Sequence, residues 1–126
     1  MSDLLLLISA LVASLGTVDA TVTDRTLDIP GVPVAFGLAR GNRETGRCSI
    51  QISTFQWRAP VRNPSLPERI AHELTHCVDF ADNVAMDGSL LPHACVTRPG
   101  HDCAHMLVDL WLADPQAGIR ALEARR

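Results

Sequence analysis

The sequence predicts one α+β domain, in which a small antiparallel sheet packs on a long helix and one or two shorter helices follow. Its 126 residues suit a single domain with its own core. Apolar and polar residues alternate from Cys48 to Ser53, which is typical of a half-buried strand. After Ser65 the apolar residues recur every three to four positions, which is typical of a helix. We expect the domain to comprise residues 21–126.

Residues 1–20 have the composition of an export signal. An apolar run from Leu4 to Leu15 precedes Val18–Ala20, a small-x-small triplet that suits signal peptidase. The run is shorter than the roughly 20 apolar residues that span a bilayer. We therefore expect an extracytoplasmic or secreted protein without a permanent membrane span. Asp3, with no basic residue before the run, is untypical of such signals. The alternative is an N-terminal helix packed on the domain of a cytoplasmic protein.

Two segments predict the sheet. A turn at Ile29–Gly31 leads into a strand at Val32–Leu38, and Cys48–Ser53 forms the second strand. The polar segment Arg40–Arg47, which contains two glycines, separates them. Together these segments indicate a small antiparallel sheet.

Capping signals predict where the long helix begins and ends. Residues 65–68, Ser-Leu-Pro-Glu, have the spacing of a capping box with a proline in the first turn. Asp82–Asn83 is the expected end. The expected buried stripe comprises Ile70, Leu74, Cys77, Val78 and Ala81.

The remaining chain predicts a loop and two helices. Residues 83–100 contain two glycines and two prolines and are expected to form a loop. A helix should run from His101 through Trp111. Asp114 then precedes a proline and can cap a final helix that ends near Glu123.

The cysteines indicate disulfides rather than a structural zinc ribbon. Cys48, Cys77, Cys95 and Cys103 form no C-x-x-C pair. An even number in a small chain with an export-like leader favours two disulfides, with the connectivity left open. In a reducing cytosol the same residues would be small buried apolar groups.

The charge distribution argues against a nucleic-acid partner. The chain has 11 basic and 14 acidic residues and a formal net charge of −3. Its basic residues are scattered and form no patch that would neutralise phosphates.

The segment His72–His76, His-Glu-Leu-Thr-His, carries the main chemical signal. On a helix, His72 and His76 project from one face within reach of a single metal ion. Glu73 lies too far around the helix axis to bind the ion together with the histidines. It can instead hydrogen-bond a metal-bound water as a general base. Zinc acidifies such a water and polarises a carbonyl group. The pattern predicts a one-zinc site that hydrolyses peptide bonds. The alternative is that these residues bind no metal and simply form a solvent-exposed face of the helix.

A strand, an irregular segment and a helix with this motif follow one another as they do in zincin metallopeptidases. Residues Ala71–Asp79 also resemble the active-site helix of thermolysin-like enzymes. This resemblance implies a minimal zincin-like domain that acts as a zinc metalloendopeptidase on proteins or peptides. It implies further that extended substrate pairs with an edge strand, which we expect near Ile50–Thr54. Specificity is expected from that strand and the 83–100 loop.

The third ligand is chosen by elimination. Asp79 and Asp82 stand where metzincins need glycine and histidine, which excludes that class. The only glutamate after Glu73 is Glu123, near the chain end, which disfavours a glutamate ligand. The residues that remain are His93, His101, Asp102, His105 and Asp109.

We favour His101 as the third ligand. It follows a glycine at the start of a predicted helix and is similar to the third zinc-binding histidine of SprT-like zincins. Asp102 and His105 stand where that family commonly has a glycine and an aromatic residue. His105 lies one helical turn from His101, so either can be the ligand while the other contacts the bound water or the oxyanion. The predicted ligands are thus His72, His76 and His101, with Glu73 and His105 as catalytic residues.

Further polar residues have predicted supporting roles. Asp79 resembles the aspartate that orients a ligand histidine in thermolysin-like enzymes, although a solvated helix-end acid is the alternative. The chain has no tyrosine to stabilise an oxyanion. Candidates for that role are His105, His93 and Arg98.

Two other functions fit the same residues. One is a non-catalytic zinc-binding module of the same fold, which Glu73 argues against because such a site needs no base. The other is an intracellular SprT-like protease that acts on DNA-bound proteins. The apolar leader and the scattered basic residues argue against it.

Overall fold

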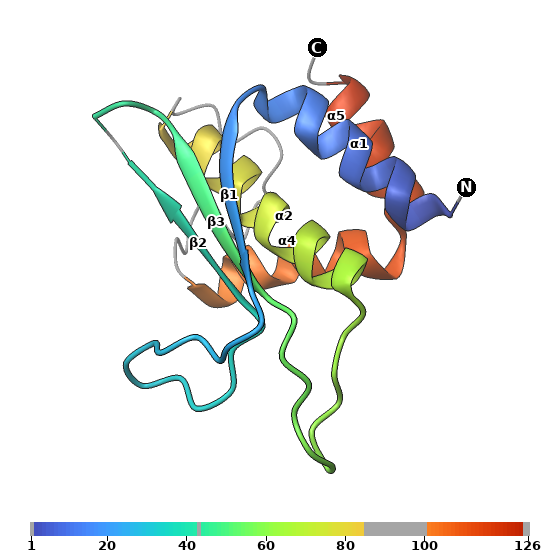
Figure 1. The fold of residues 1–126 in the computed structure, drawn as a ribbon. Coiled ribbons are helices and arrows are strands. Elements are labelled where there is room, and N and C mark those ends of the chain that lie inside the picture. Colours follow the sequence, from blue (N-terminus) through green and yellow to red (C-terminus); the bar gives the residue numbers. More distant parts are fainter. Residues whose placement is uncertain (1, 43, 85–100, 125–126) are drawn as a thin grey trace.

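The computed structural model describes residues 2–42, 44–84 and 101–124. Its elements in chain order are α1 (Asp3–Leu15), β1 (Val18–Thr23), β2 (Gly37–Gly41), β3 (Cys48–Ser53), α2 (Leu66–Val84), α4 (His101–Ala113) and α5 (Pro115–Ala124). The predicted α+β class is confirmed. Helices cover one face of a three-stranded sheet, and α2 lies between the sheet and the pair α1 and α5 (Figure 1).

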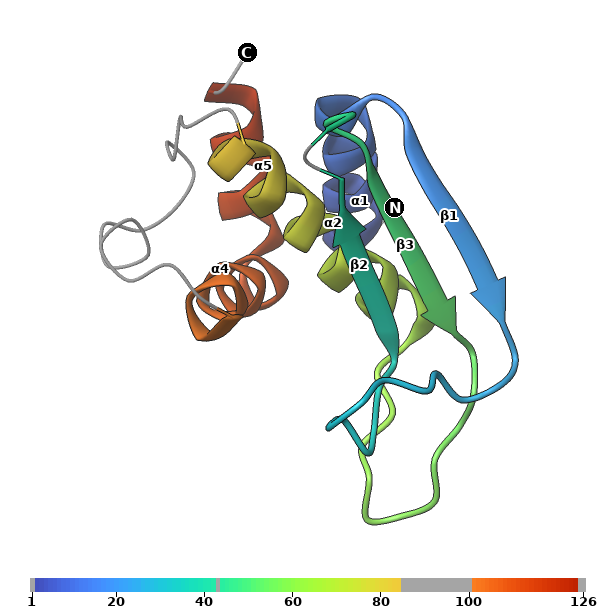
Figure 2. The ribbon, with the colours of Figure 1, turned by 90° about the vertical axis from the view of Figure 1, so that its left-hand side faces the viewer.

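The sheet is mixed rather than antiparallel. Its strand order is β1-β3-β2; β2 pairs with β3 antiparallel, as predicted, whereas β1 pairs with β3 parallel, with Val18 opposite Cys48. The expectation of an edge strand near Ile50–Thr54 is wrong, because β3 is the central strand. β2 forms the edge on the side of α4 (Figure 2). A parallel third strand has no local signal because its partner lies about 30 residues away in the chain.

The strand predicted at Val32–Leu38 begins later, at Gly37. Pro33 lacks an amide donor, which disfavours ladder pairing there. A tight turn sets the pairing instead: the amide of Asn42 donates to the Arg47 carbonyl at 2.8 Å, and the amide of Gly46 donates to the Asn42 carbonyl at 2.8 Å. The ladder therefore extends into residues that were expected to be loop.

The predicted helix boundaries are confirmed within about two residues. Glu68 donates its amide hydrogen to Ser65 Oγ at 3.3 Å, as a capped helix start requires. At the start of α5, the amide of Ala117 donates to Asp114 Oδ1 at 3.3 Å. Both caps satisfy amides that a helix end leaves without a partner. The predicted loop at residues 83–100 lies mostly outside the described residues.

The N-terminal helix contributes to the core. Leu7 and Leu11, four residues apart on α1, are fully buried, and α1 packs against α2 and α5. A buried leucine contributes roughly 1.5–3 kcal/mol relative to an exposed one. The triplet Val18–Ala20 lies in β1. Export and cleavage of residues 1–20 stay predictions, and no helix among the described residues is long and apolar enough to cross a membrane.

A disulfide joins the sheet to α2. Cys48 at the start of β3 bonds to Cys77, which directly follows His76. Both residues are buried, with exposed fractions of 6% and 0%. Cys95 and the side chain of Cys103 lie outside the described residues, so a second disulfide stays a prediction.

The disulfide should stabilise the fold substantially. The two cysteines are 29 residues apart in sequence, and closing a loop of this length in the unfolded chain corresponds to about 3–4 kcal/mol. The Cys48→Ala/Cys77→Ala variant should lose about that free energy of unfolding, measured by urea denaturation without reductant. Equal urea midpoints for variant and wild type would contradict the expectation.

Candidate metal centre

Two histidines of α2 lie side by side, as their spacing predicts. Nε2 of His72 and Nε2 of His76 are 3.2 Å apart, and the ring centroids are 4.9 Å apart. Both side chains are half-buried. The i,i+4 spacing on a continuous helix accounts for this geometry.

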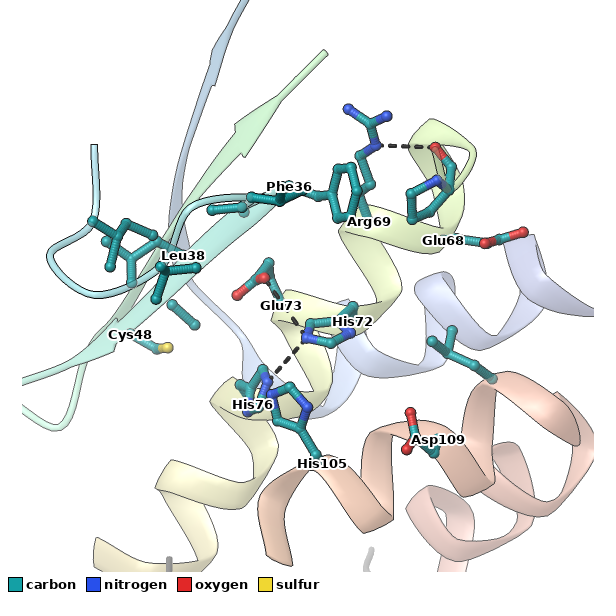
Figure 3. Close-up of a pocket in the computed structure, with 18 of the residues that line it drawn as sticks. Phe36, Leu38, Cys48, Glu68, Arg69, His72, Glu73, His76, His105 and Asp109 are labelled. Carbon is teal, nitrogen blue, oxygen red and sulfur yellow. Dashed lines mark hydrogen bonds and ion pairs between the residues drawn. The ribbon is translucent and has the colours of Figure 1, made fainter. Parts of the chain in front are cut away.

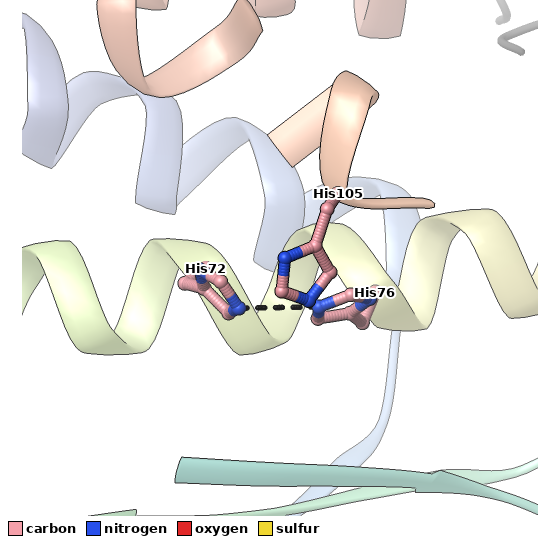
Figure 4. Close-up of side chains that lie close together, drawn as sticks. All are labelled: His72, His76 and His105. Carbon is pink, nitrogen blue, oxygen red and sulfur yellow. Dashed lines mark hydrogen bonds between the residues drawn. The ribbon is translucent and has the colours of Figure 1, made fainter. Parts of the chain in front are cut away.

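A third histidine reaches the pair from α4. The ring centroid of His105 lies 5.2 Å from that of His72 and 5.0 Å from that of His76 (Figure 4). Each of the three residues offers a ring nitrogen, and these nitrogens all lie within 4.8 Å of one another. Zinc binds imidazole nitrogens at about 2.0–2.1 Å, so ligand atoms around one ion must converge to a few ångströms. This cluster can hold a metal ion.

The cluster differs from the favoured ligand set in its third member. We expected His101 as the ligand and His105 beside the bound water, whereas the structure brings His105 to the pair. His101 is the first residue of α4, and its side chain lies outside the described residues. A ligand role for His101 stays a prediction.

The other candidate residues fall in three groups. Asp109 lines the cavity but is not a member of the three-histidine cluster. Asp79 is half-buried on α2, and its orienting role stays a prediction. The remaining candidates, His93, Arg98 and the side chain of Asp102, lie outside the described residues.

Glu73 is buried beside the cluster. Its exposed fraction is 5%, and its Oε1 lies 3.9 Å from His72 Nε2. Burial raises the pKa of this carboxyl group from 4.5 to about 7, because the charged form loses hydration. A carboxyl group with such a pKa can accept or release a proton near neutral pH, which is what a general base needs.

The cluster and Glu73 line one cavity of about 680 Å³ (Figure 3). Its walls come from β2 and the segment before it, from α2 and from α4. Many of the other lining residues are apolar, including Val34, Phe36, Leu38 and Leu112. The cavity therefore combines a polar floor on α2 with largely apolar walls, as ligand sites commonly do.

Arg69, in the first turns of α2, links the elements that form the cavity wall. Its guanidinium group lies 4.8 Å from the ring centroid of Phe36, and Nη1 donates to the carbonyls of Ser53 at 2.6 Å and Phe55 at 3.0 Å. Nε donates to the Pro64 carbonyl at 3.0 Å. These contacts tie the residues before β2 and after β3 to the helix that carries the histidines.

Sequence reasoning overlooked Arg69 and Phe36 as parts of the site. Arg69 lies three residues before His72 and four before Glu73, so helical spacing alone places it on the neighbouring face. Its contact with Phe36 has no sequence signal because it joins elements more than 30 residues apart.

Comparison with known protein families, curated proteins and solved structures finds no match for this chain.

In the metal-free protein, Glu73 should make stability depend on pH. The folded-state pKa of about 7 exceeds the unfolded value of 4.5, so the unfolded chain loses its proton first. Stability should therefore fall as pH rises from 4.5 to 7, by about 3 kcal/mol. Glu73→Gln should remove this pH dependence. The measurement is the free energy of unfolding in urea, with a chelator present, for wild type and for Glu73→Gln at each pH. Parallel pH profiles would contradict it.

The third ligand can be tested with a matched pair of variants. His105→Ala removes a member of the cluster and should lower zinc affinity at least 100-fold, whereas His101→Ala should change it less than about 3-fold. Competition with a chromogenic chelator measures both affinities. The reverse result would assign the third ligand to His101.

Proposed function

We propose that this protein is a zinc metalloendopeptidase, with His72, His76 and His105 as the ligands and Glu73 as the general base. The observation that carries the proposal is the convergence of three imidazoles beside a buried carboxyl group in one cavity. Three histidine nitrogens suit zinc and leave a fourth position for water, which is typical of catalytic rather than structural zinc sites.

The residues divide the work of hydrolysis as follows. A bound zinc ion supplies Lewis-acid polarisation of the peptide carbonyl and acidifies water. Glu73 takes a proton from the attacking water, whose oxygen bonds to the carbonyl carbon. Glu73 then passes the proton to the amide nitrogen as the carbon–nitrogen bond breaks.

The outer edge of β2 is the proposed binding site for extended substrate. Phe36 accepts a hydrogen bond from the Ser53 amide at 3.0 Å, and the Asn42 amide donates to Arg47, so even-numbered residues pair with β3. In an antiparallel ladder, the residues between the hydrogen-bonded pairs point their amides and carbonyls away from the partner strand. Gly37, Ala39 and Gly41 therefore offer these groups to a peptide added along β2.

A peptide at this edge would lie in the cavity that the histidines line. β2, α2 and α4 all contribute to that cavity, and β2 is the strand of the sheet on the side of α4 (Figure 2). A strand edge binds main chain rather than a chain terminus, which favours an endopeptidase. The apolar walls favour apolar side chains next to the scissile bond.

We propose an extracytoplasmic location. The Cys48–Cys77 disulfide is compatible with an oxidising compartment. A cytoplasmic SprT-like protease is the alternative, which the disulfide and the net charge of −3 disfavour.

Glu73→Gln tests the proposal directly. The variant should keep near-stoichiometric zinc, because the ligands are unchanged, and should lose about 100- to 1,000-fold in kcat on casein or a quenched peptide. Metal analysis and a fluorescence assay measure the two properties, and phenanthroline should abolish wild-type activity until zinc is restored. If the wild-type protein contains zinc but cleaves neither substrate, the protein is a non-catalytic zinc-binding module. A protein without zinc would refute the metal centre itself.

A further inference from the structure

Gly37 on β2 faces the carboxyl group of Glu73 at a distance that leaves no room for a side chain. A Cβ atom at position 37 would lie 2.7 Å from Cγ of Glu73, 2.8 Å from Oε1 and 3.0 Å from Cδ. Carbon atoms in favourable contact are about 3.5–4.0 Å apart. The carboxyl group therefore occupies the space that any other residue at this position would fill.

The backbone does not itself require glycine here. Gly37 lies in a regular strand opposite Ile52, and within the described part of the chain the glycines with positive φ are Gly16, Gly31 and Gly46. An alanine could adopt the backbone angles of a strand without strain. Space, rather than conformational freedom, is what glycine provides at this position.

The strand is held on both sides of the contact. Before Gly37, the Phe36 carbonyl accepts from the Ser53 amide at 3.0 Å and the Phe36 ring packs under the Arg69 guanidinium. β3, in turn, is bonded to α2 through the Cys48–Cys77 disulfide. Since β2 cannot easily move away from α2, an added methyl group would displace the mobile end of the Glu73 side chain.

We propose that Gly37 is a positioning residue, which by lacking a side chain lets the Glu73 carboxyl group lie between β2 and α2 beside the three-histidine centre. The inference rests on the proposed role of Glu73 as general base. The contact holds Oε1 3.9 Å from His72 Nε2, and a larger residue at position 37 moves that oxygen away from the place where water would be activated.

Gly37→Ala separates positioning from metal binding. The three ligand imidazoles are untouched, so zinc stoichiometry should stay at the wild-type value. The kcat should fall about 10- to 100-fold, as expected for a catalytic group displaced by about 1 Å, while KM changes less than about 3-fold. An unchanged kcat in a folded, zinc-loaded variant overturns the inference.

Gly118→Ala is the matched control. Its added Cβ would also meet a tight environment, 2.8 Å from Leu7 and 2.9 Å from Trp111, but in α5 and outside the cavity lining. This variant should lose stability, and the kcat of its folded, zinc-loaded form should fall much less than that of Gly37→Ala. An equal loss of kcat in both variants overturns the inference, because general loosening of the fold would then explain the effect.

A double-mutant cycle shows whether Gly37 acts through Glu73. In a Glu73→Ala background the space opposite position 37 is open, so Gly37→Ala should have no further effect on residual activity or on thermal stability. Additive effects overturn the inference. If Gly37→Ala alone does not fold, folding of the double variant supports the contact, and failure of both overturns it.

Cobalt(II) substitution gives a readout that needs no peptidase activity. The pH midpoint of the visible spectrum of the cobalt protein should shift in Gly37→Ala toward that of Glu73→Ala, and should stay at the wild-type value in Gly118→Ala. If wild type cleaves no peptide, the proposed function fails, and the cobalt midpoint still decides the inference. A wild-type midpoint in Gly37→Ala overturns it.

Discussion

The close approach of α2 to β2 is the constraint on which the rest of the site depends. It brings a buried carboxyl group against a strand edge, with Gly37 leaving the space that the Glu73 side chain fills. The Arg69–Phe36 contact holds the two elements together at one end, and the Cys48–Cys77 disulfide joins α2 to the neighbouring strand. Burial disfavours the charged form of a carboxyl group, and it raises the pKa of Glu73 for that reason.

The second requirement is the placement of α4, since two histidines of one helix cannot by themselves complete a metal site. Buried Leu107 and Trp111 anchor α4 in the core that α1, α2 and α5 share, which points His105 toward the α2 pair. Three half-buried imidazoles thus lie beside a buried carboxyl group. A cation at this point would favour the charged carboxylate and the neutral imidazoles together.

Local signals predicted the helices well, and long-range pairing limited the rest. Ser65 and Asp114 cap helices as expected because a cap depends on only a few neighbouring residues. β1 was missed because Val18–Ala20, half of its six residues, were assigned to a leader and its partner β3 is distant in sequence. The His72–His76 pair follows from helical periodicity alone. The choice between His101 and His105 depends on how α4 packs against α2. This packing cannot be deduced from a single sequence.

The central claim is that three histidines, and no cysteine, hold one zinc ion with a fourth position for water. X-ray absorption at the zinc edge tests it most directly in the zinc-loaded protein. We expect four nitrogen or oxygen neighbours at about 2.0–2.1 Å, with the outer-shell scattering of three imidazoles. Sulfur neighbours at about 2.3 Å, or the outer-shell scattering of fewer than three imidazoles, would contradict it.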